Sequence, residues 1–456
     1  MRDGNIRFMM IDTHIQQHLD AHLNEVIELC AQPSVSARSE GTRECAELVA
    51  TVLARHGLAV QKFETAGNPI LIAHADGASP RTLLCYNHYD VQPPEPLNLW
   101  ESPPFEPAIR DGALYARGSR DDKGELVARL AAMDAVRAAH HGELPCGITF
   151  IVEGEEEIGS PHIAHFVEHH KRALACQGAI WEEGGIEPGG APYISLGARG
   201  LLAVELSIST MKTDAHSGRA LFLPSAAWRM VGALQSLKDG DERILIDGFY
   251  DSARGPSVRD LEFLEALPDT LALDRDIYGI REYLHGRTSA EVKRAVFEPT
   301  CNIQGINTGY QGDGLKTVIP SKASAKLDFR LVPDQEPDVC FGLLRAHLDK
   351  LGFADVVATR LGGMHPAQTP SGDPLVALAS RAAQAVYGKP AVIYPMVGGS
   401  SPIHAFRNPL GGIPVINPGI GYWDNRAHAP NEHFRINDFV QATRHLARVM
   451  EGFANL

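Results

Sequence analysis

The chain has 456 residues, which is more than one hydrophobic core usually accommodates, so we expect two domains. Its composition, 44% hydrophobic and 21% charged, is ordinary for a globular protein. The 42 Lys and Arg against 56 Asp and Glu leave a formal net charge of −14, which argues against nucleic acid or an anionic membrane as the main partner.

Helix and strand patterns alternate over the first part of the chain. Asp12 is expected to cap a helix whose apolar residues recur at helical spacing up to Cys30. The further elements expected, in chain order, are a helix at 42–55, strands at 58–63, 69–74 and 82–86, a helix at 123–140, a strand at 147–152, a helix at 161–173 and a strand at 178–181. This alternation predicts an α/β fold with a mainly parallel sheet flanked by helices.

The pattern changes after residue 198. A longer strand is expected at 201–210, then a helix at 224–237, a strand at 321–332 with cleanly alternating apolar and polar residues, and a helix at 336–351. Alternation resumes near 374, with strands at 391–395 and 412–416 and a last helix at 436–453. We therefore expect one discontinuous domain, 1–198 and 365–456, interrupted by an inserted α+β domain at 199–364.

Seven cysteines are scattered along the chain, and no pair has Cys-x-x-Cys spacing. This odd and dispersed set argues against a disulfide framework or a thiolate zinc site, and favours core thiols in a reducing compartment. Residues 1–5 lead into no apolar segment with a small-residue cleavage site, and no apolar run approaches the roughly 20 residues that span a bilayer. We expect a cytoplasmic protein that does not bind a membrane.

His88 and Asp90 follow an expected strand and are two residues apart. In an extended chain they project to the same face. A histidine that binds a metal through one ring nitrogen needs a partner for the other, and a carboxylate is a common one. On its own the pair is more typical of a hydrogen bond at the end of a strand, so the metal interpretation depends on the rest of the sequence.

Four more segments carry acidic or histidine side chains in loops or just after expected strands. They are 117–124, 153–160, 181–185 and 427–432. Ligand sites of α/β sheets gather where strands end and loops begin, so these segments are expected to converge. Clustered carboxylates repel each other unless a cation offsets the repulsion. The alternative is a set of solvated loops, helix N-caps and salt bridges, but the whole set favours a cation site.

Three of these motifs, in this order, resemble those of the M20 metallopeptidase family, and its dipeptidase branch (carnosinase-like and PepV-like enzymes) in particular. They are His88-Tyr89-Asp90-Val91-Gln92-Pro93, Gly118-x-x-Asp121-Asp122-Lys123-Gly124 and Glu153-Gly154-x-Glu156-Glu157-x-Gly159-Ser160. The resemblance implies a di-metal exopeptidase-like catalytic domain with an inserted lid or dimerisation domain. It also implies two divalent metal ions per subunit, with Zn²⁺ expected and Mn²⁺ or Co²⁺ as alternatives.

The resemblance assigns the metal ligands. It implies that His88, Asp121 and Glu182 hold one metal, and that Asp121 bridges to a second metal completed by Glu157 and His428. Only a carboxylate has two oxygens that can bridge in this way, and neutral imidazoles suit borderline-soft Zn²⁺.

The resemblance also assigns three catalytic roles. It implies that Asp90 orients the His88 ring, that Glu156 is the general base for a water shared by the two metals, and that His216 of the inserted domain stabilises the oxyanion. In many members of the family the residue corresponding to His216 reaches the active site of the partner subunit. On residue type alone, His216 is a polar loop histidine.

Substrate contacts are implied for Arg330, Ser400 and Gly399. The arginine of the similar segment in the branch binds the terminal carboxylate of the substrate, a task that suits a fork of donors. The residue types alone indicate only a solvated arginine and a flexible turn. The chain departs from the branch at Val397, because carnosinase-like enzymes have an acid there that receives the free amino group of the substrate.

The implied function is metal-dependent hydrolysis of the amide bond of dipeptides or similar small peptides by a homodimeric enzyme. Val397 keeps open an N-acyl-amino-acid amidohydrolase with the same metal site, since an unpaired ammonium beside an apolar side chain is costly to bury. A binding protein that has lost catalysis would lack a ligand or the base, and none is replaced. Residues 241–300 receive no assignment.

Overall fold

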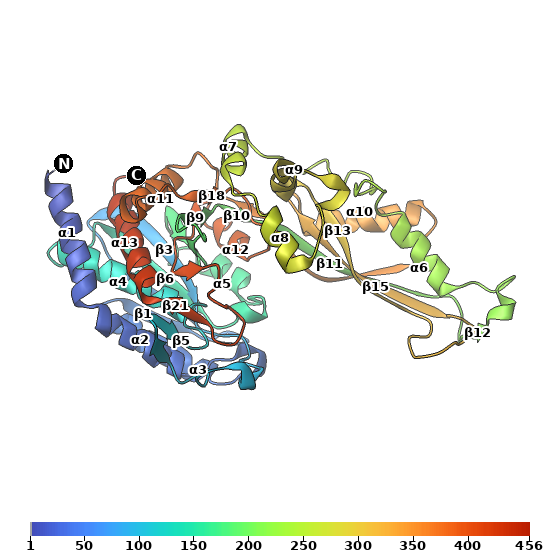
Figure 1. Cartoon of the computed structure of the whole chain (residues 1–456), viewed down its shortest axis with the longest axis horizontal. Coiled ribbons are helices and arrows are strands. Elements are labelled where there is room, and N and C mark those ends of the chain that lie inside the picture. Colours follow the sequence, from blue (N-terminus) through green and yellow to red (C-terminus); the bar gives the residue numbers. More distant parts are fainter. Residues whose placement is uncertain (1) are drawn as a thin grey trace. The chain divides into compact units, whose positions relative to one another are not determined.

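The computed structural model describes residues 2–456. The chain forms two compact units, the first made of residues 1–196, 369–395 and 405–456 and the second of residues 197–368 and 396–404 (Figure 1). No helix among residues 2–456 is long and apolar enough to cross a membrane.

A six-stranded sheet forms the centre of the first unit, with the strand order β1-β2-β6-β3-β7-β19. Its strands are β1 (Ala59–Phe63), β2 (Ile70–Ala75), β3 (Ser79–His88), β6 (Cys146–Glu153), β7 (Gly178–Ile180) and β19 (Val415–Ile416). Strands β6, β3, β7 and β19 pair in parallel, which confirms the expected α/β fold with a mainly parallel sheet. Strands β1 and β2 are antiparallel because the short connection between them cannot make the crossover that parallel pairing needs.

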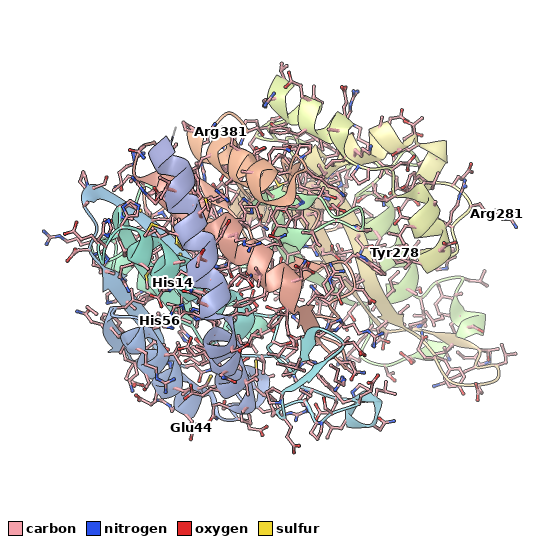
Figure 2. The ribbon with its side chains drawn as sticks, turned by 60° about the vertical axis from the view of Figure 1, so that its left-hand side comes forward. His14, Glu44, His56, Tyr278, Arg281 and Arg381 are labelled. Atoms are coloured by element: carbon pink, nitrogen blue, oxygen red, sulfur yellow. The ribbon has the colours of Figure 1, made fainter. Side chains whose placement is uncertain are left out.

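The helices of the first unit are α1 (Arg2–Gln17), α2 (Leu19–Ala31), α3 (Thr42–Arg55), α4 (Lys123–Ala139), α5 (Ile163–His169), α11 (Pro374–Tyr387) and α13 (Ile436–Phe453); α12 (Ile403–Arg407) begins in the second unit and ends in the first. Helices α4 and α13 pack on each other and on the central sheet, with α1 against α4 and α11 against α13. Figure 2 labels His14 on α1 and His56, the residue that follows α3.

Nearly every residue of α4 is buried, as its run of small apolar side chains favours. Arg129 extends from this helix and donates to the backbone carbonyls of Tyr86 in β3 and Trp181 after β7. A buried cation needs such partners. These two hydrogen bonds join α4 to β3, which ends at His88, and to the residue after β7, which immediately precedes Glu182.

Two smaller sheets complete the first unit. Their strands are β18 (Val392–Tyr394), β9 (Pro192–Ser195), β8 (Gly185–Ile186) and β20 (Gly421–Tyr422) in one, and β21 (His433–Arg435), β5 (Ala113–Tyr115) and β4 (Ala108–Arg110) in the other. Antiparallel pairing of β21 with β5 joins two segments from opposite ends of the chain. The loop before β21 therefore lies beside the loop that follows β5.

The second unit contains a four-stranded antiparallel sheet with the order β13-β15-β11-β16. Its strands and helices are β10 (Gly197–Ala198), β11 (Gly200–Ser209), β12 (Ala215–His216), β13 (Thr300–Thr308), β14 (Val318–Ile319), β15 (Lys322–Leu331), β16 (Val357–Met364), β17 (Ala367–Gln368), α6 (Ala226–Gln235), α7 (Val258–Ala266), α8 (Leu271–Tyr278), α9 (Ser289–Arg294) and α10 (Pro337–Lys350). Helices α6 and α10 pack on this sheet. The alternation expected in β15 is present, except that Asp328 is also buried, where it accepts a hydrogen bond from Asn302.

Two expectations about the chain need correction. Asp12 does not cap a helix: it lies inside α1, and its carboxylate faces Arg444 and Arg448 of α13 at 3.5 and 3.6 Å. Residues 197–198, 365–368 and 396–404, expected in the discontinuous catalytic domain, belong to the second unit.

Backbone pairing explains the position of residues 396–404. The N–H of Val397 donates to the carbonyl of Gly197, and the N–H of Arg199 donates to the carbonyl of Gly399, both at 2.9 Å. An isolated parallel bridge between Ala198 of β10 and Val397 thus joins the segment to the second unit. The alternation of helices and strands in the sequence does not reveal such pairing, because it depends on residues about 200 positions away.

Candidate metal centre

Five side chains of the first unit that we expected to bind metals come from five separate segments. His88 ends β3, Asp121 lies in the loop after β5, Glu157 follows β6, Glu182 follows β7, and His428 lies in the loop before β21. Strands β6, β3 and β7 are neighbours and run parallel, so their carboxyl ends open onto one edge of the sheet.

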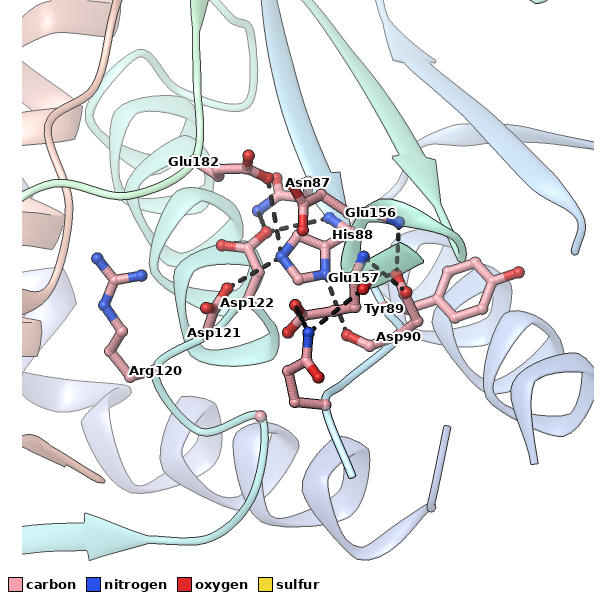
Figure 3. A network of polar contacts seen from close by, with 12 residues as sticks. Asn87, His88, Tyr89, Asp90, Arg120, Asp121, Asp122, Glu156, Glu157 and Glu182 are labelled. Atoms are coloured by element: carbon pink, nitrogen blue, oxygen red, sulfur yellow. Dashed lines mark hydrogen bonds and ion pairs between the residues drawn. The ribbon is translucent and has the colours of Figure 1, made fainter. Parts of the chain in front are cut away.

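Asp121 presents one carboxylate oxygen to each of two histidines (Figure 3 shows the side of His88). Its Oδ1 lies 3.0 Å from His88 Nε2 and its Oδ2 lies 3.0 Å from His428 Nε2. Glu157 Oε2 is 3.2 Å from the same His428 nitrogen, and Glu182 Oε2 is 3.7 Å from His88 Nε2. In a tetrahedral site with bonds of ~2.0–2.1 Å, neighbouring donor atoms are ~3.3 Å apart. The spacing of these donors therefore fits two cations that share Asp121.

The charges of the cluster also fit cations. Burial raises the pKa of Glu182 well above its ordinary value, with the charge of Glu156 adding to the effect, and Glu182 Oε2 has no hydrogen-bond partner among residues 2–456. Hydrogen bonds to Asp121 and Glu157 raise the pKa of His428 to about 10. The site thus favours positive charge, and its imidazole and carboxylate donors are those that Zn²⁺ and Mn²⁺ accept.

Asp122 is a further buried acid at this edge. Together with His88 and Glu182 it forms a group whose donor atoms lie within 4.8 Å of one another. Its Oδ2 accepts hydrogen bonds from Asn87 Nδ2 at 2.6 Å and from the backbone N–H of His88 at 3.1 Å, so Asp122 holds the end of β3. The peptide bond between Asp121 and Asp122 is cis.

Asp90 faces both His88 and the acidic segment after β6. Its backbone carbonyl lies 3.0 Å and its Oδ1 3.4 Å from His88 Nδ1. Its two carboxylate oxygens accept the backbone N–H groups of Glu156 at 3.2 Å and Glu157 at 3.1 Å. The backbone carbonyl of Asp90 thus holds the imidazole, while its carboxylate lies beside the ring and accepts the N–H groups of two neighbouring acids (Figure 3).

Glu156 stands next to Glu157 in a 3-10 turn, Glu156–Ile158. Burial raises the pKa of Glu156 to about 8, against the opposing charge of His88, and the carboxylate of Glu157 contributes to the rise. A carboxyl group that changes protonation near neutral pH suits a group that accepts and returns a proton.

Glu432 is a supporting residue to which the sequence had assigned no role. It is fully buried and accepts backbone N–H groups of Gly118, Arg120 and Asp121, each at 3.0 Å, together with Arg117 Nη1 at 2.7 Å. It holds the loop of Asp121 from a position four residues after His428. In the sequence, Glu432 is marked only by its place in the same segment as His428. Residue type alone does not distinguish such a buried glutamate from a solvated one.

Two further contacts shape the acidic segment. Gln92 Nε2 donates to Glu157 Oε2 at 2.9 Å. Gly154 packs against Tyr89 so closely that a Cβ at this position would lie 2.2 Å from the ring, which explains a glycine between two acids. Tyr89 is buried, and its hydroxyl donates to the carbonyl of Pro69 at 2.7 Å.

The other expected site residues belong to the second unit. Arg330 Nη1 donates to Ser400 Oγ at 2.7 Å, although 70 positions separate them, and Gly399 is exposed beside Ser400. His216 is exposed at the end of β12, where its Nδ1 accepts the backbone N–H of Gly218 at 3.0 Å. The structure thus joins Arg330 with the Gly-Gly-Ser turn and leaves His216 on a separate loop of the same unit.

Replacing Glu432 by Gln should destabilise the protein and weaken the hydrogen bonds that position the loop of Asp121. Breaking a buried ion pair costs roughly 3–5 kcal/mol, so we expect the free energy of unfolding to fall by about 3 kcal/mol in urea titrations. The matched control is Glu95→Gln, which breaks the exposed pair with Arg38 and should leave stability unchanged. Equal effects of the two substitutions would contradict the role of Glu432.

Comparison with known proteins agrees with this geometry. Residues 84–452 match the model of the family described as Peptidase family M20/M25/M40. The chain is 27% identical over 406 residues to the Beta-Ala-His dipeptidase of Homo sapiens (85% of this chain, 78% of that protein). It is 27% identical over 405 residues to the Cys-Gly metallodipeptidase DUG1 of Saccharomyces cerevisiae (84% and 82%).

A solved structure extends the likeness to the whole chain. The M20 family metallo-carboxypeptidase Sso-CP2 from Sulfolobus solfataricus superposes with a TM-score of 0.86 at 34% identity, covering 95% of this chain and 99% of that one. These matches confirm the resemblance that the three motifs indicated. The chain belongs to the M20/M25/M40 peptidase family and is a hydrolase that uses divalent metal ions.

Proposed function

We propose that the protein hydrolyses the peptide bond of dipeptides or similar small peptides at a centre of two divalent metal ions. The observation that carries the proposal is Asp121, whose two oxygens face His88 and His428. Two relatives that span more than four fifths of the chain are named as dipeptidases, and one of them as a metallodipeptidase.

The residues that would hold the metals are His88, Asp121 and Glu182 for one ion, and Asp121, Glu157 and His428 for the other. Two such ions, when bound, polarise the substrate carbonyl and lower the pKa of a water. Zinc is the metal we expect because two of the five donors are imidazoles, and manganese and cobalt are the alternatives.

Glu156 is the proposed general base. It accepts a proton from the attacking water, and it then returns the proton to the amide nitrogen as the C–N bond breaks. Asp90 acts on this step through position, since it accepts the backbone N–H of Glu156 and faces His88. His216 is the proposed donor to the oxyanion, a role in which hydrogen-bond donors contribute strongly to catalysis.

Changing Glu156 to Gln should remove the base and leave the metal ligands in place. General acid–base catalysis contributes on the order of 10²–10⁴-fold, so we expect kcat to fall by at least about 100-fold. Steady-state kinetics and metal analysis by mass spectrometry check this, with the exposed Glu168→Gln as the matched control. Full activity, or loss of a metal from the Glu156 variant, would remove Glu156 as the base.

Arg330 and Ser400 form the proposed site for the carboxylate of the substrate. Arginine offers a planar fork of donors that matches a carboxylate, and the hydrogen bond to Ser400 Oγ fixes the orientation of that fork. The free amino group of a dipeptide has no acid at Val397 to receive it.

Val397 therefore favours a second candidate function, hydrolysis of an amide whose amino end is acylated. A substrate that keeps its terminal carboxylate and lacks a free ammonium needs Arg330 but no acid at position 397. The likeness at 34% identity to a protein named as a metallo-carboxypeptidase supports the same possibility.

A matched substrate panel separates the two functions. The zinc-loaded protein is assayed with a free dipeptide, its N-acetyl form and its C-terminal amide. Dipeptidase function predicts the largest kcat/KM for the free dipeptide and a loss for the amide, since the amide cannot pair with Arg330. A preference for the N-acetyl form, which Val397→Glu should reverse, would support the acyl-amino-acid function. Hydrolysis of none of the three would contradict both.

A second copy of this chain is the proposed partner of the second unit. Leu221, Phe222 and Trp228 lie on and just before α6 and are 94%, 68% and 77% exposed. Large apolar side chains gathered in one region mark interaction sites. The loop that carries His216 lies close in sequence to these apolar residues. Its Asp214 accepts hydrogen bonds from the N–H and the hydroxyl of Ser321, at 2.9 and 2.8 Å.

Light scattering during size exclusion should give the mass of a dimer. Trp228→Asp should shift the protein to the monomer, because it places a charge in an apolar interface. The control is Leu273→Asp, which changes a 54% exposed leucine of α8 in the same unit and should leave the dimer intact. A monomeric wild-type protein would exclude this proposal.

We propose the cytoplasm as the location of the protein. All seven cysteines are free and buried, as is usual for core thiols in a reducing compartment.

A further inference from the structure

A second cluster of metal-type side chains lies in the first unit, at residues that precede the segment matching the family model. His22 and Glu25 are three residues apart on α2 and therefore share one face of that helix. His56 follows the last residue of α3 (labelled in Figure 2). The cluster thus joins two helices and contains none of the side chains assigned to catalysis.

The donor atoms have the spacing of a single coordination sphere. Glu25 Oε2 lies 3.1 Å from His56 Nε2 and 3.3 Å from His22 Nδ1, and the three donor atoms lie within 4.8 Å of one another. A tetrahedral zinc ion with bonds of ~2.0–2.1 Å places neighbouring donors ~3.3 Å apart. Two imidazoles and one carboxylate are also a donor set that zinc accepts, with a fourth position for water. The Glu25 side chain is 17% exposed, which leaves room for that water.

The second nitrogen of His56 already has the partner that a zinc ligand needs. Its Nδ1 lies 2.6 Å from Asp134 Oδ2 of α4. Asp134 is held in turn by Arg137, which donates to its Oδ1 at 3.2 Å and to the backbone carbonyl of His56 at 2.8 Å. A carboxylate on the outer nitrogen fixes the ring with Nε2 directed at the metal.

His22 supplies an independent observation. It is only 6% exposed, and its Nε2 has no hydrogen-bond partner among residues 2–456. Its Nδ1 makes a single long contact with Glu25. Nδ1 is the atom that would bind the metal, and a bond to a metal would compensate its burial better than this one long contact does; Nε2 lies on another edge of the ring and is not part of the site.

We propose that His22, Glu25 and His56 bind a zinc ion that is separate from the catalytic pair. The ion joins α2 to α3 and, through Asp134, to α4. The competing arrangement uses the same atoms without a metal: His56 is then a cation between the carboxylates of Glu25 and Asp134, and His22 only packs beside it. The two arrangements differ in the number of metal ions bound.

The experiment counts zinc in the full-length protein. Wild type, His22→Gln and Glu25→Gln are each saturated with Zn²⁺, exchanged into metal-free buffer and analysed by mass spectrometry. We expect one zinc per chain more in wild type than in either variant, with an unchanged far-UV circular dichroism spectrum of all three, which shows that the fold remains intact. A wild-type count equal to that of both variants overturns the proposal.

The matched control is His18→Gln, which removes an exposed histidine from the turn that precedes α2. This variant should keep the additional zinc. Loss of that zinc from His18→Gln as well would indicate that surface histidines bind it, and would overturn the assignment. Cobalt adds a spectroscopic test, because tetrahedral Co²⁺ absorbs visible light strongly. The last equivalent of Co²⁺ bound by wild type should produce a band that His22→Gln lacks. Because the count needs no substrate, it remains decisive if the proposed peptidase activity fails.

Discussion

The candidate metal centre depends on one buried carboxylate, that of Asp121, which stands between two histidines. Its oxygens lie 3.0 Å from His88 at the end of β3 and 3.0 Å from His428 near the end of the chain. A carboxylate in this position can bridge two cations, whereas an imidazole cannot. The arrangement requires two loops more than 300 residues apart in sequence to remain in register. Glu432 provides the register, because it accepts three backbone N–H groups of the Asp121 loop and an arginine.

Burial makes this cluster of carboxylates costly and also favours the binding of cations. Carboxylates withdrawn from water repel each other strongly and take up protons or cations. Burial raises the pKa of Glu156 and Glu182, while hydrogen bonds to two carboxylates raise that of His428. The supporting contacts of Asp90 and Asp122 are therefore part of the same chemistry, since they fix where each charge lies. The edge of a parallel sheet suits this purpose because several strand ends open onto it.

The residues proposed to contact the substrate lie in the second unit. Its sheet positions Arg330, and residues 396–404 bring Ser400 to it through backbone pairing with β10. A single departure from the dipeptidase branch, Val397, lies in the same segment. In the proposed function, Arg330 binds the terminal carboxylate of the substrate and Val397 offers no acid to its amino group.

Motifs and apolar periodicity are local properties of the chain, so they were enough to predict the family, the α/β class and most helices and strands. The sequence also predicted the ligand side chains around Asp121: the three motifs contain His88 and Glu157, and two further segments contain Glu182 and His428. Three features appear only in the folded chain: Glu432 holds the Asp121 loop, residues 396–404 join the second unit, and His22 lies beside His56. Each of these depends on contacts between distant segments, and a buried acid and an exposed acid look alike in a sequence until the chain has folded.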